Sequence, residues 1–201
     1  SQNSFTNFAM SGIDQRHMGI ELGFKVPLVL QGLSLEGALS WGEYIYTSTP
    51  RMTQTIDNSA EIIAENQPVP YWASHPIYKK TNGEYDYDTE GNPVVEKNQK
   101  HYVPSTPQLA SSLGLNYRTN SYWFFELAGQ YFANSYLDMN PLYRTQMAVS
   151  GPDKIATPME IEYMAAQEKF APVFLLNASV GKSWYIDRKY NFGFSMNIQN
   201  I

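Results

Sequence analysis

The chain has 201 residues, of which 43% are hydrophobic and 14% aromatic, while only 16% are charged. Soluble domains carry about 25% charged residues, so the composition indicates a folded chain with a sparsely charged surface. A formal net charge of -5 and the lack of any long basic run argue against a nucleic-acid partner. The absence of cysteine excludes disulfides and thiolate metal sites, and the apolar runs are too short for a spanning helix of about 20 residues.

In chain order, apolar and polar residues alternate with a period of two in six segments, which is the pattern of strands with one apolar face. The fourth segment is typical: Trp123, Phe125 and Leu127 alternate with Phe124 and Glu126. We expect each strand to reach the roughly 9 to 11 residues that cross a bilayer at a tilt. The six segments are 19–26, 33–41, 109–117, 123–134, 174–181 and 190–199.

The connections between these segments alternate in length. Residues 27–32, 119–120 and 187–189 are predicted to form tight turns, so that the strands make three hairpins. The two connections between the hairpins, about 47–105 and about 136–168, are long. Compact domains rarely contain structureless loops above about 15 residues, whereas transmembrane barrels combine short periplasmic turns with long outer loops.

The pattern therefore predicts an all-β fold of antiparallel transmembrane β-barrel strands. The polar face is rich in small and amide side chains, which suits a hydrated or plugged lumen, and aromatic residues gather near the strand ends as two interfacial girdles. A water-soluble β-sandwich is the alternative, because alternation does not say what the apolar face touches. The lumen-facing candidates are Glu21, Glu36, Asn116, Glu126 and Gln130.

Two stretches carry a family resemblance. "YRTNSYWFFELAGQYFANSYLDMNPLYRT" (117–145) resembles a segment of the later barrel strands in Bacteroidetes-type TonB-dependent outer-membrane receptors, and "VGKSWYIDRKYNFGFSMNIQN" (180–200) is similar to the strand pair that follows. The order and spacing of these pieces carry the match, and residues 1–50 fit only as generic barrel strands.

The resemblance implies a barrel of about 22 strands, of which this chain is expected to be one fragment, 1–201, without the plug domain, the TonB box or the closing strands. It implies the outer membrane of a Gram-negative bacterium as location, and outer-membrane lipid as a partner. It also implies coupling to the TonB system through the missing plug, a transported small ligand, and in some relatives a surface lipoprotein.

Three short motifs invite other functions. Asp86, Asp88 and Glu90 in "DYDTEGN" follow the first half of a calcium loop, but Lys97 stands where the bidentate glutamate belongs, so a hairpin tip is preferred over a loose cation site. "GKS" at 181–183 has no glycine at the start of a phosphate loop. The three histidines have no ligand spacing, and no catalytic residue or cofactor is predicted.

The long connection 47–105 is rich in proline and aromatic residues. Aromatics on an exposed loop are suited to binding a glycan, peptide or siderophore, and they equally suit a small core of the loop itself. Short helices are expected at 60–66 and within 157–170, and the alternative for the second stretch is that it runs straight into the strand beginning near Phe170. The aromatic candidates for ligand contact are Tyr71, Trp72, Tyr78, Tyr85, Tyr87 and Tyr102.

The function expected from these observations is that of a barrel segment in a TonB-dependent receptor, which takes part in energised uptake of a substrate of the siderophore, glycan or peptide class. The alternative is a soluble or surface-attached β-sandwich that binds a glycan or a protein. An enzyme ranks third, because no convergent set of titratable residues is visible in the sequence.

Overall fold

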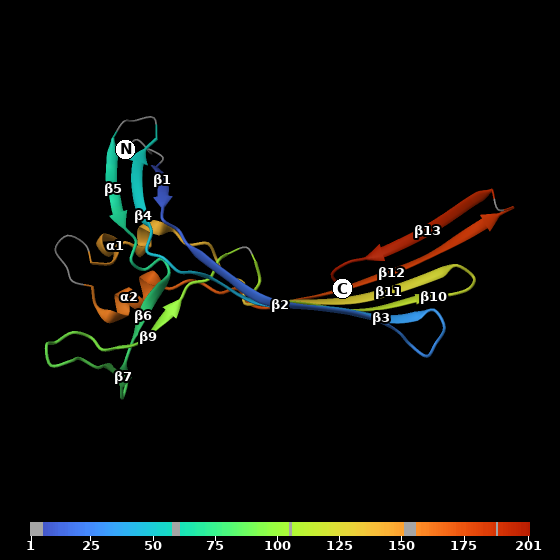
Figure 1. The fold of residues 1–201 in the computed structure, drawn as a ribbon, viewed down its shortest axis with the longest axis horizontal. Coiled ribbons are helices and arrows are strands. Elements are labelled where there is room, and N and C mark those ends of the chain that lie inside the picture. The colour runs from blue at the N-terminus through green and yellow to red at the C-terminus, as the bar shows by residue number, and fades with distance from the viewer. Residues whose placement is uncertain (1–5, 58–60, 105, 151–155, 188) are drawn as a thin grey trace. The chain divides into compact units, whose positions relative to one another are not determined.

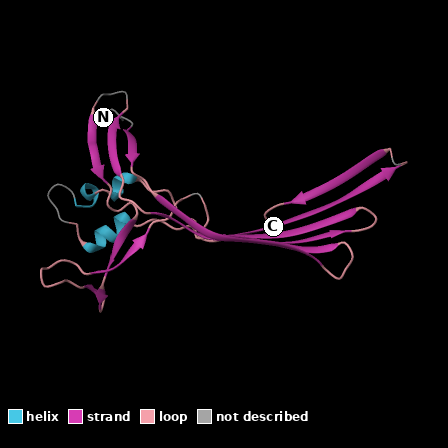
Figure 2. Ribbon diagram, viewed as in Figure 1, coloured by secondary structure: helices cyan, strands magenta, loops and turns pink. Residues whose placement is uncertain are grey.

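A computed structural model describes residues 6–57, 61–104, 106–150, 156–187 and 189–201. The fold is all-β and antiparallel, as predicted, with short helical segments added (Figure 2). The chain divides into two units. The strand unit comprises 18–42, 106–135 and 169–201, and the loop unit comprises 1–17, 43–105 and 136–168.

The strand unit is built on one six-stranded antiparallel sheet in the order β13-β12-β11-β10-β3-β2 (Figure 1). The six predicted strands are all present, and consecutive strands form the three predicted hairpins. Their lengths run from nine to fourteen residues. The bounds are β2 Gln15–Pro27, β3 Leu33–Tyr46, β10 Leu109–Arg118, β11 Trp123–Ala133, β12 Val173–Ile186 and β13 Tyr190–Ile198.

Three short turns close the hairpins. In the first turn, Gly32 has a φ of +85°, and a Cβ there would collide with the carbonyl oxygen of Arg118, so the position requires glycine. The second turn is longer than predicted: the amide of Thr119 donates to the Trp123 carbonyl, and Tyr122 takes a φ of +65° before the strand begins. The third joins β12 to β13, and residue 188 of its predicted range lies outside the described residues.

The long connections contain strands and helices of their own. A three-stranded sheet has the order β1-β4-β5, and two small pairs, β6-β9 and β7-β8, lie in the same unit. The strands are β1 Thr6–Ser11, β4 Arg51–Ile56, β5 Ile62–Pro68, β6 Ser74–Tyr78, β7 Lys80–Thr81, β8 Glu84–Tyr85 and β9 Val95–Lys100.

The helices of the loop unit come from its second long segment. They are the 3-10 helix η1 Pro141–Arg144, α1 Gln146–Ser150 and α2 Pro158–Ala165. The predicted helix within 157–170 is thus confirmed, and it begins at a capping box in which Thr157 and Glu160 bond each other's backbone amides. The helix predicted at 60–66 is wrong: residue 60 lies outside the described residues, and β5 begins at Ile62. Among the residues that the structure describes, no helix has the length and apolarity needed to span a membrane.

Candidate functional site

One face of the six-stranded sheet is a continuous apolar surface. Strand register places Leu127 opposite Leu115 on β10 and opposite Ala178 on β12, so the large apolar residues of neighbouring strands share this face. The exposed residues among them have relative exposures from 37% for Tyr131 to 70% for Phe192, while others on the same face, such as Leu35 and Val180, are half-buried. The face carries Met18, Ile20, Leu22, Phe24, Val26, Leu39, Trp41, Leu113, Leu115, Trp123, Phe125, Leu127, Tyr131, Phe174, Trp184, Ile186, Tyr190, Phe192, Phe194, Met196 and Ile198.

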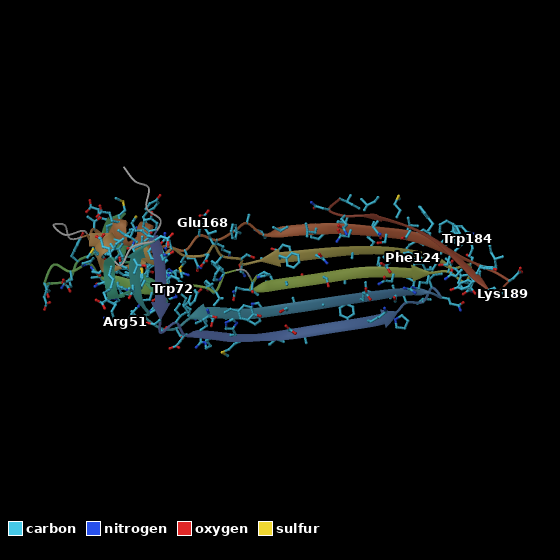
Figure 3. All side chains as sticks on the ribbon, turned by 90° about the horizontal axis from the view of Figure 1, so that it is seen from above. Arg51, Trp72, Phe124, Glu168, Trp184 and Lys189 are labelled. Atoms are coloured by element: carbon cyan, nitrogen blue, oxygen red, sulfur yellow. The ribbon has the colours of Figure 1, made fainter. Side chains whose placement is uncertain are left out.

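This exposure means that no second layer of the described strand unit covers the apolar face. Side chains stand on the sheet along its whole length, with Trp184 and Lys189 near its short-turn end (Figure 3). Fully burying one Leu- or Phe-sized side chain contributes about 1.5 to 3 kcal/mol. A surface of this extent in water is therefore unfavourable, and such patches mark sites of protein or membrane contact.

The opposite face of the sheet holds all five of the lumen-facing candidates. Asn116 pairs with Glu126 on β11, and Gln130 pairs with Ser112 on β10. Glu36 accepts a hydrogen bond from Asn116 and forms a 3.2 Å ion pair with Lys25. Glu21 alternates with Leu22 and so lies on this polar face as well.

One aromatic ring on the polar face fills the space left by a glycine. The ring of Phe124 lies where a Cβ on Gly181 would be, directly across from it in the register of β11 and β12. The carbonyl oxygen of Phe194 would be 2.6 Å from the same Cβ. Such packing of an aromatic ring over a glycine stabilises the sheet at a position where the strand has no side chain of its own.

In the loop unit, two of the six aromatic candidates lie in cores. Trp72 is 5% exposed and packs with Met52 and Val69. Tyr78 is 7% exposed and packs with Ile161 of α2 in a second cluster. Their burial confirms the small-core interpretation for these two residues and removes them as ligand contacts in this conformation.

The other four aromatic candidates differ in exposure. Tyr71 and Tyr85 are half-buried against the second cluster. Tyr102 is half-buried and stacks on Tyr136 with 4.2 Å between ring centroids. Tyr87 is 55% exposed. A solvent-facing ring is therefore most available at Tyr87, followed by the edge of the Tyr102 stack.

Glu162 on α2 ties the second cluster to its neighbouring strands. Its carboxylate accepts hydrogen bonds from the Tyr78 amide at 2.7 Å, the Tyr85 hydroxyl at 3.2 Å and the Lys80 ammonium at 3.2 Å. Burial acts to raise the pKa of Glu162, but these three donors outweigh it and hold the pKa below the usual value. The carboxylate thus serves as a structural anchor for the loop unit.

A buried histidine pair is the arrangement that sequence reasoning missed. His75 and His101 come together with 2.7 Å between Nδ1 of His75 and Nε2 of His101. Nδ1 of His101 lies 2.9 Å from the Trp72 carbonyl oxygen, which only accepts, so this nitrogen donates and Nε2 accepts from His75. The two residues are 26 positions apart with no ligand-like spacing, and no local signal points to the pair.

Burial keeps this pair neutral. It lowers the pKa of His101 to about 4, with the neighbouring His75 and Arg144 adding to the effect. Burial likewise lowers the pKa of His75, and Arg144 contributes there too. Arg144 is itself buried and donates to the carbonyl oxygens of Asn140 and Ala166, at 3.1 and 2.8 Å. A second positive charge at this place is therefore unfavourable.

The acidic motif forms a hairpin tip, as preferred from the sequence. Asp88 accepts from the amides of Glu90 and Asn92 at 2.9 and 2.8 Å, and Tyr87 bridges to Pro93 across the tip. Asp86 accepts from Thr81 and pairs with Lys79. Among the described residues no three acidic or histidine side chains are grouped to hold a metal ion.

Comparisons with protein-family models, with curated proteins and with solved structures found no match for this chain. Its function is therefore inferred from its own residues, above all from the two unlike faces of the six-stranded sheet.

Proposed function

We propose that the six-stranded sheet is a sector of the wall of an outer-membrane β-barrel, with its apolar face against lipid and its polar face toward the lumen. The observation that carries this proposal is the uncovered apolar face across all six strands, with exposures up to 70% at Phe192. Lipid chains can cover such an apolar face, so that no layer of protein is needed over it.

Three further features support lipid over a second sheet. Strands of nine to fourteen residues match the length that crosses a bilayer. The polar face presents glycine, serine, alanine and amides, with few lysines, whereas the outer face of a soluble sandwich is strongly charged. Trp123, Trp184 and Tyr190 stand near the short-turn end of the apolar face, where a barrel places its aromatic girdle.

The six strands do not close a barrel by themselves. At each edge of the described sheet, β2 and β13 pair on one side only. Within a membrane such open edges require partners, because unpaired backbone groups cost several kcal/mol each in hydrocarbon. In the proposal, further strands complete the wall around this sector.

The biological role that follows is energised uptake through a TonB-dependent receptor in the outer membrane of a Gram-negative bacterium. The wall would be passive, the TonB system would act through a plug, and no residue here is assigned a catalytic role. The loop unit would lie outside the cell, where Tyr87 and the half-buried Tyr102 are the aromatic candidates most available to a transported ligand or a surface lipoprotein, beside the exposed Tyr143 and Tyr163. A binding module that hides its apolar face against protein is the competing function.

Adjacent positions on β11 test the proposal directly. Leu127→Cys and Glu126→Cys carry a spin label on opposite faces of one strand. In the reconstituted protein we expect collisions at 127 with oxygen dissolved in lipid, and collisions at 126 with a water-soluble nickel chelate. A label at 127 that is shielded from both relaxants would mean that protein covers the apolar face, and the binding module would replace the barrel.

The orientation is tested in intact cells that produce the protein. Asn92→Cys at the hairpin tip of the loop unit and Asn120→Cys in the second short turn are each exposed. A membrane-impermeant maleimide should label position 92 at once and position 120 only after the outer membrane is made permeable. Equal labelling at both positions would contradict a spanning sheet.

A further inference from the structure

The apolar face of the strand unit carries one charged side chain among its described residues, Lys182. It is opposite Trp123 on β11 and opposite Phe194 on β13, in a row that is otherwise apolar. A lysine in such a position is costly in hydrocarbon unless its ammonium reaches the polar boundary of the bilayer. Its place near the short-turn end of β12 puts that boundary within reach.

The ammonium of Lys182 is held by two indole rings. It lies 4.9 Å from the ring centroid of Trp123 and 5.6 Å from that of Trp184. It also donates to the carbonyl oxygen of Ser121 at 3.2 Å. Within the part of the chain that the structure describes, no carboxylate forms an ion pair with it, although Lys25 on the opposite face is paired with Glu36.

A shallow groove of about 650 Å³ opens beside this lysine, lined among others by Tyr122, Lys182, Trp184, Phe192 and Phe194. Its walls are aromatic, and its charge is a single cation oriented by two rings. That combination suits a molecule with an anionic head and an apolar body: the oxyanion meets the ammonium, and the acyl chain lies along the rings.

We propose that Lys182, Trp123 and Trp184 form a headgroup clamp that binds the phosphate of an anionic phospholipid in the leaflet around the short turns. This inference rests on the proposed function, since it requires the apolar face to meet lipid. Phosphatidylglycerol fits the clamp better than a zwitterionic lipid, because the headgroup of a zwitterionic lipid carries a positive charge that would repel the ammonium of Lys182. The clamp would fix the depth of the barrel sector at its periplasmic boundary.

The test uses tryptophan fluorescence of the full chain in bilayers at about 0.15 M salt, where long-range attraction is screened. Quenching by brominated phosphatidylglycerol is compared with quenching by brominated phosphatidylcholine, which gives the relative binding constant of the two lipids. We expect a preference of about fivefold for phosphatidylglycerol, the effect of one basic residue at a membrane surface. Lys182→Met should reduce the ratio to near one, and Lys182→Arg should keep it.

Lys25→Met is the matched control, because it removes the same charge from the opposite face of the sheet. Equal loss of preference in Lys25→Met and Lys182→Met would reduce the effect to overall charge and overturn the clamp. Equal quenching by both lipids in the unmodified chain would also overturn it, while leaving the barrel intact. If neither lipid quenches, the apolar face does not meet lipid, and the proposed function fails together with the clamp.

Discussion

The two units of this chain use apolar residues in opposite ways. In the loop unit, Met52, Val69 and Trp72 turn inward and are at most 5% exposed. In the strand unit, Phe192 and Leu22 turn outward and are 70% and 62% exposed. The loop unit thus supplies its own apolar environment, whereas the strand unit needs one from outside. The buried apolar residues of the loop unit stabilise its fold, whereas the exposed apolar residues of the strand unit determine in which environment the sheet is stable.

Polar residues show the reverse arrangement. In the loop unit, Glu162 and the pair of His75 and His101 are drawn into the packing and satisfied there by short hydrogen bonds. In the strand unit, Glu36 and Asn116 stand on an open face. A change inside the loop unit should therefore affect stability strongly, and a conservative change on the strand unit should affect it weakly.

The largest expected effect is that of Trp72→Ala in the loop unit. Truncating a buried tryptophan removes its transfer free energy and leaves a cavity, and we expect a loss of about 3 to 5 kcal/mol in the free energy of unfolding of this unit. Hydrogen exchange followed by mass spectrometry should show faster exchange in β4 and β6. Trp41→Ala is the control, since Trp41 is 60% exposed on the sheet. A similar loss in both variants would break the contrast between the units.

The second effect is a pH dependence of the loop unit. Burial lowers the pKa of His101 from 6.5 to about 4, so the unfolded chain binds the proton more readily than the folded one. The stability of the unit is therefore complete above about pH 6.5 and falls as the pH drops toward 4. At 1.36 kcal/mol per pKa unit, the loss is about 3 kcal/mol.

Hydrogen exchange in β6 and β9 as a function of pH measures this loss. His101→Gln should flatten the change between pH 6.5 and 4, at a lower stability overall. His17→Gln is the matched control, because His17 is exposed and stacks on Tyr44 outside the buried pair. An unaltered slope in His101→Gln would show that other groups cause the acid sensitivity.

The sheet of the strand unit was largely predictable from the sequence. The strands of the sheet and the shared face of Glu36, Asn116 and Glu126 followed from the period of two, because the backbone of a strand sends successive side chains to opposite faces. The alternation of apolar and polar residues is a local pattern, so it predicts each strand independently of the others. The short turns predicted the three hairpins, β2-β3, β10-β11 and β12-β13, whereas the pairings of β3 with β10 and of β11 with β12 join strands separated by the long connections and were not predicted.

The loop unit was not predictable in the same way. "AEIIAEN" (60–66) contains good helix formers, yet Ala64 and Gln67 pair with β4, and this tertiary pairing outweighs the small differences in helix propensity. Trp72 is buried by Met139 from the other long segment. The contact between His75 and His101 likewise depends on the pairing of β6 with β9. Contacts between distant segments leave no periodic signal in the sequence.

The third effect is expected at the glycines of the strand unit. A methyl group at Gly181 would meet the ring of Phe124 and lie 2.6 Å from the Phe194 carbonyl oxygen, whereas the nearest atom at Gly193 is 3.8 Å away. Gly181→Ala should therefore lower the free energy of unfolding by about 1 to 3 kcal/mol, and Gly193→Ala should leave it nearly unchanged or raise it. Denaturant midpoints of the reconstituted protein measure both. Equal midpoints would mean that the polar face is loosely packed.

The smallest expected effect is the most informative about what covers the sheet. Phe192→Leu exchanges one large apolar side chain for another at a position that is 70% exposed. Lipid chains adapt to either shape, so we expect a change below about 0.5 kcal/mol in the unfolding free energy of the reconstituted protein.

Ile161→Val provides the scale for that measurement, because it removes one methyl group from a residue of the loop unit that is 8% exposed. This truncation should cost about 0.5 to 1.5 kcal/mol. Protein packed against the apolar face would respond differently from lipid: a rigid covering layer would be left with a void at position 192. A loss in Phe192→Leu that equals or exceeds the loss in Ile161→Val would therefore favour a covered sheet. A negligible loss in Phe192→Leu, together with a clear loss in Ile161→Val, would mean that the apolar face of the sheet meets a fluid partner.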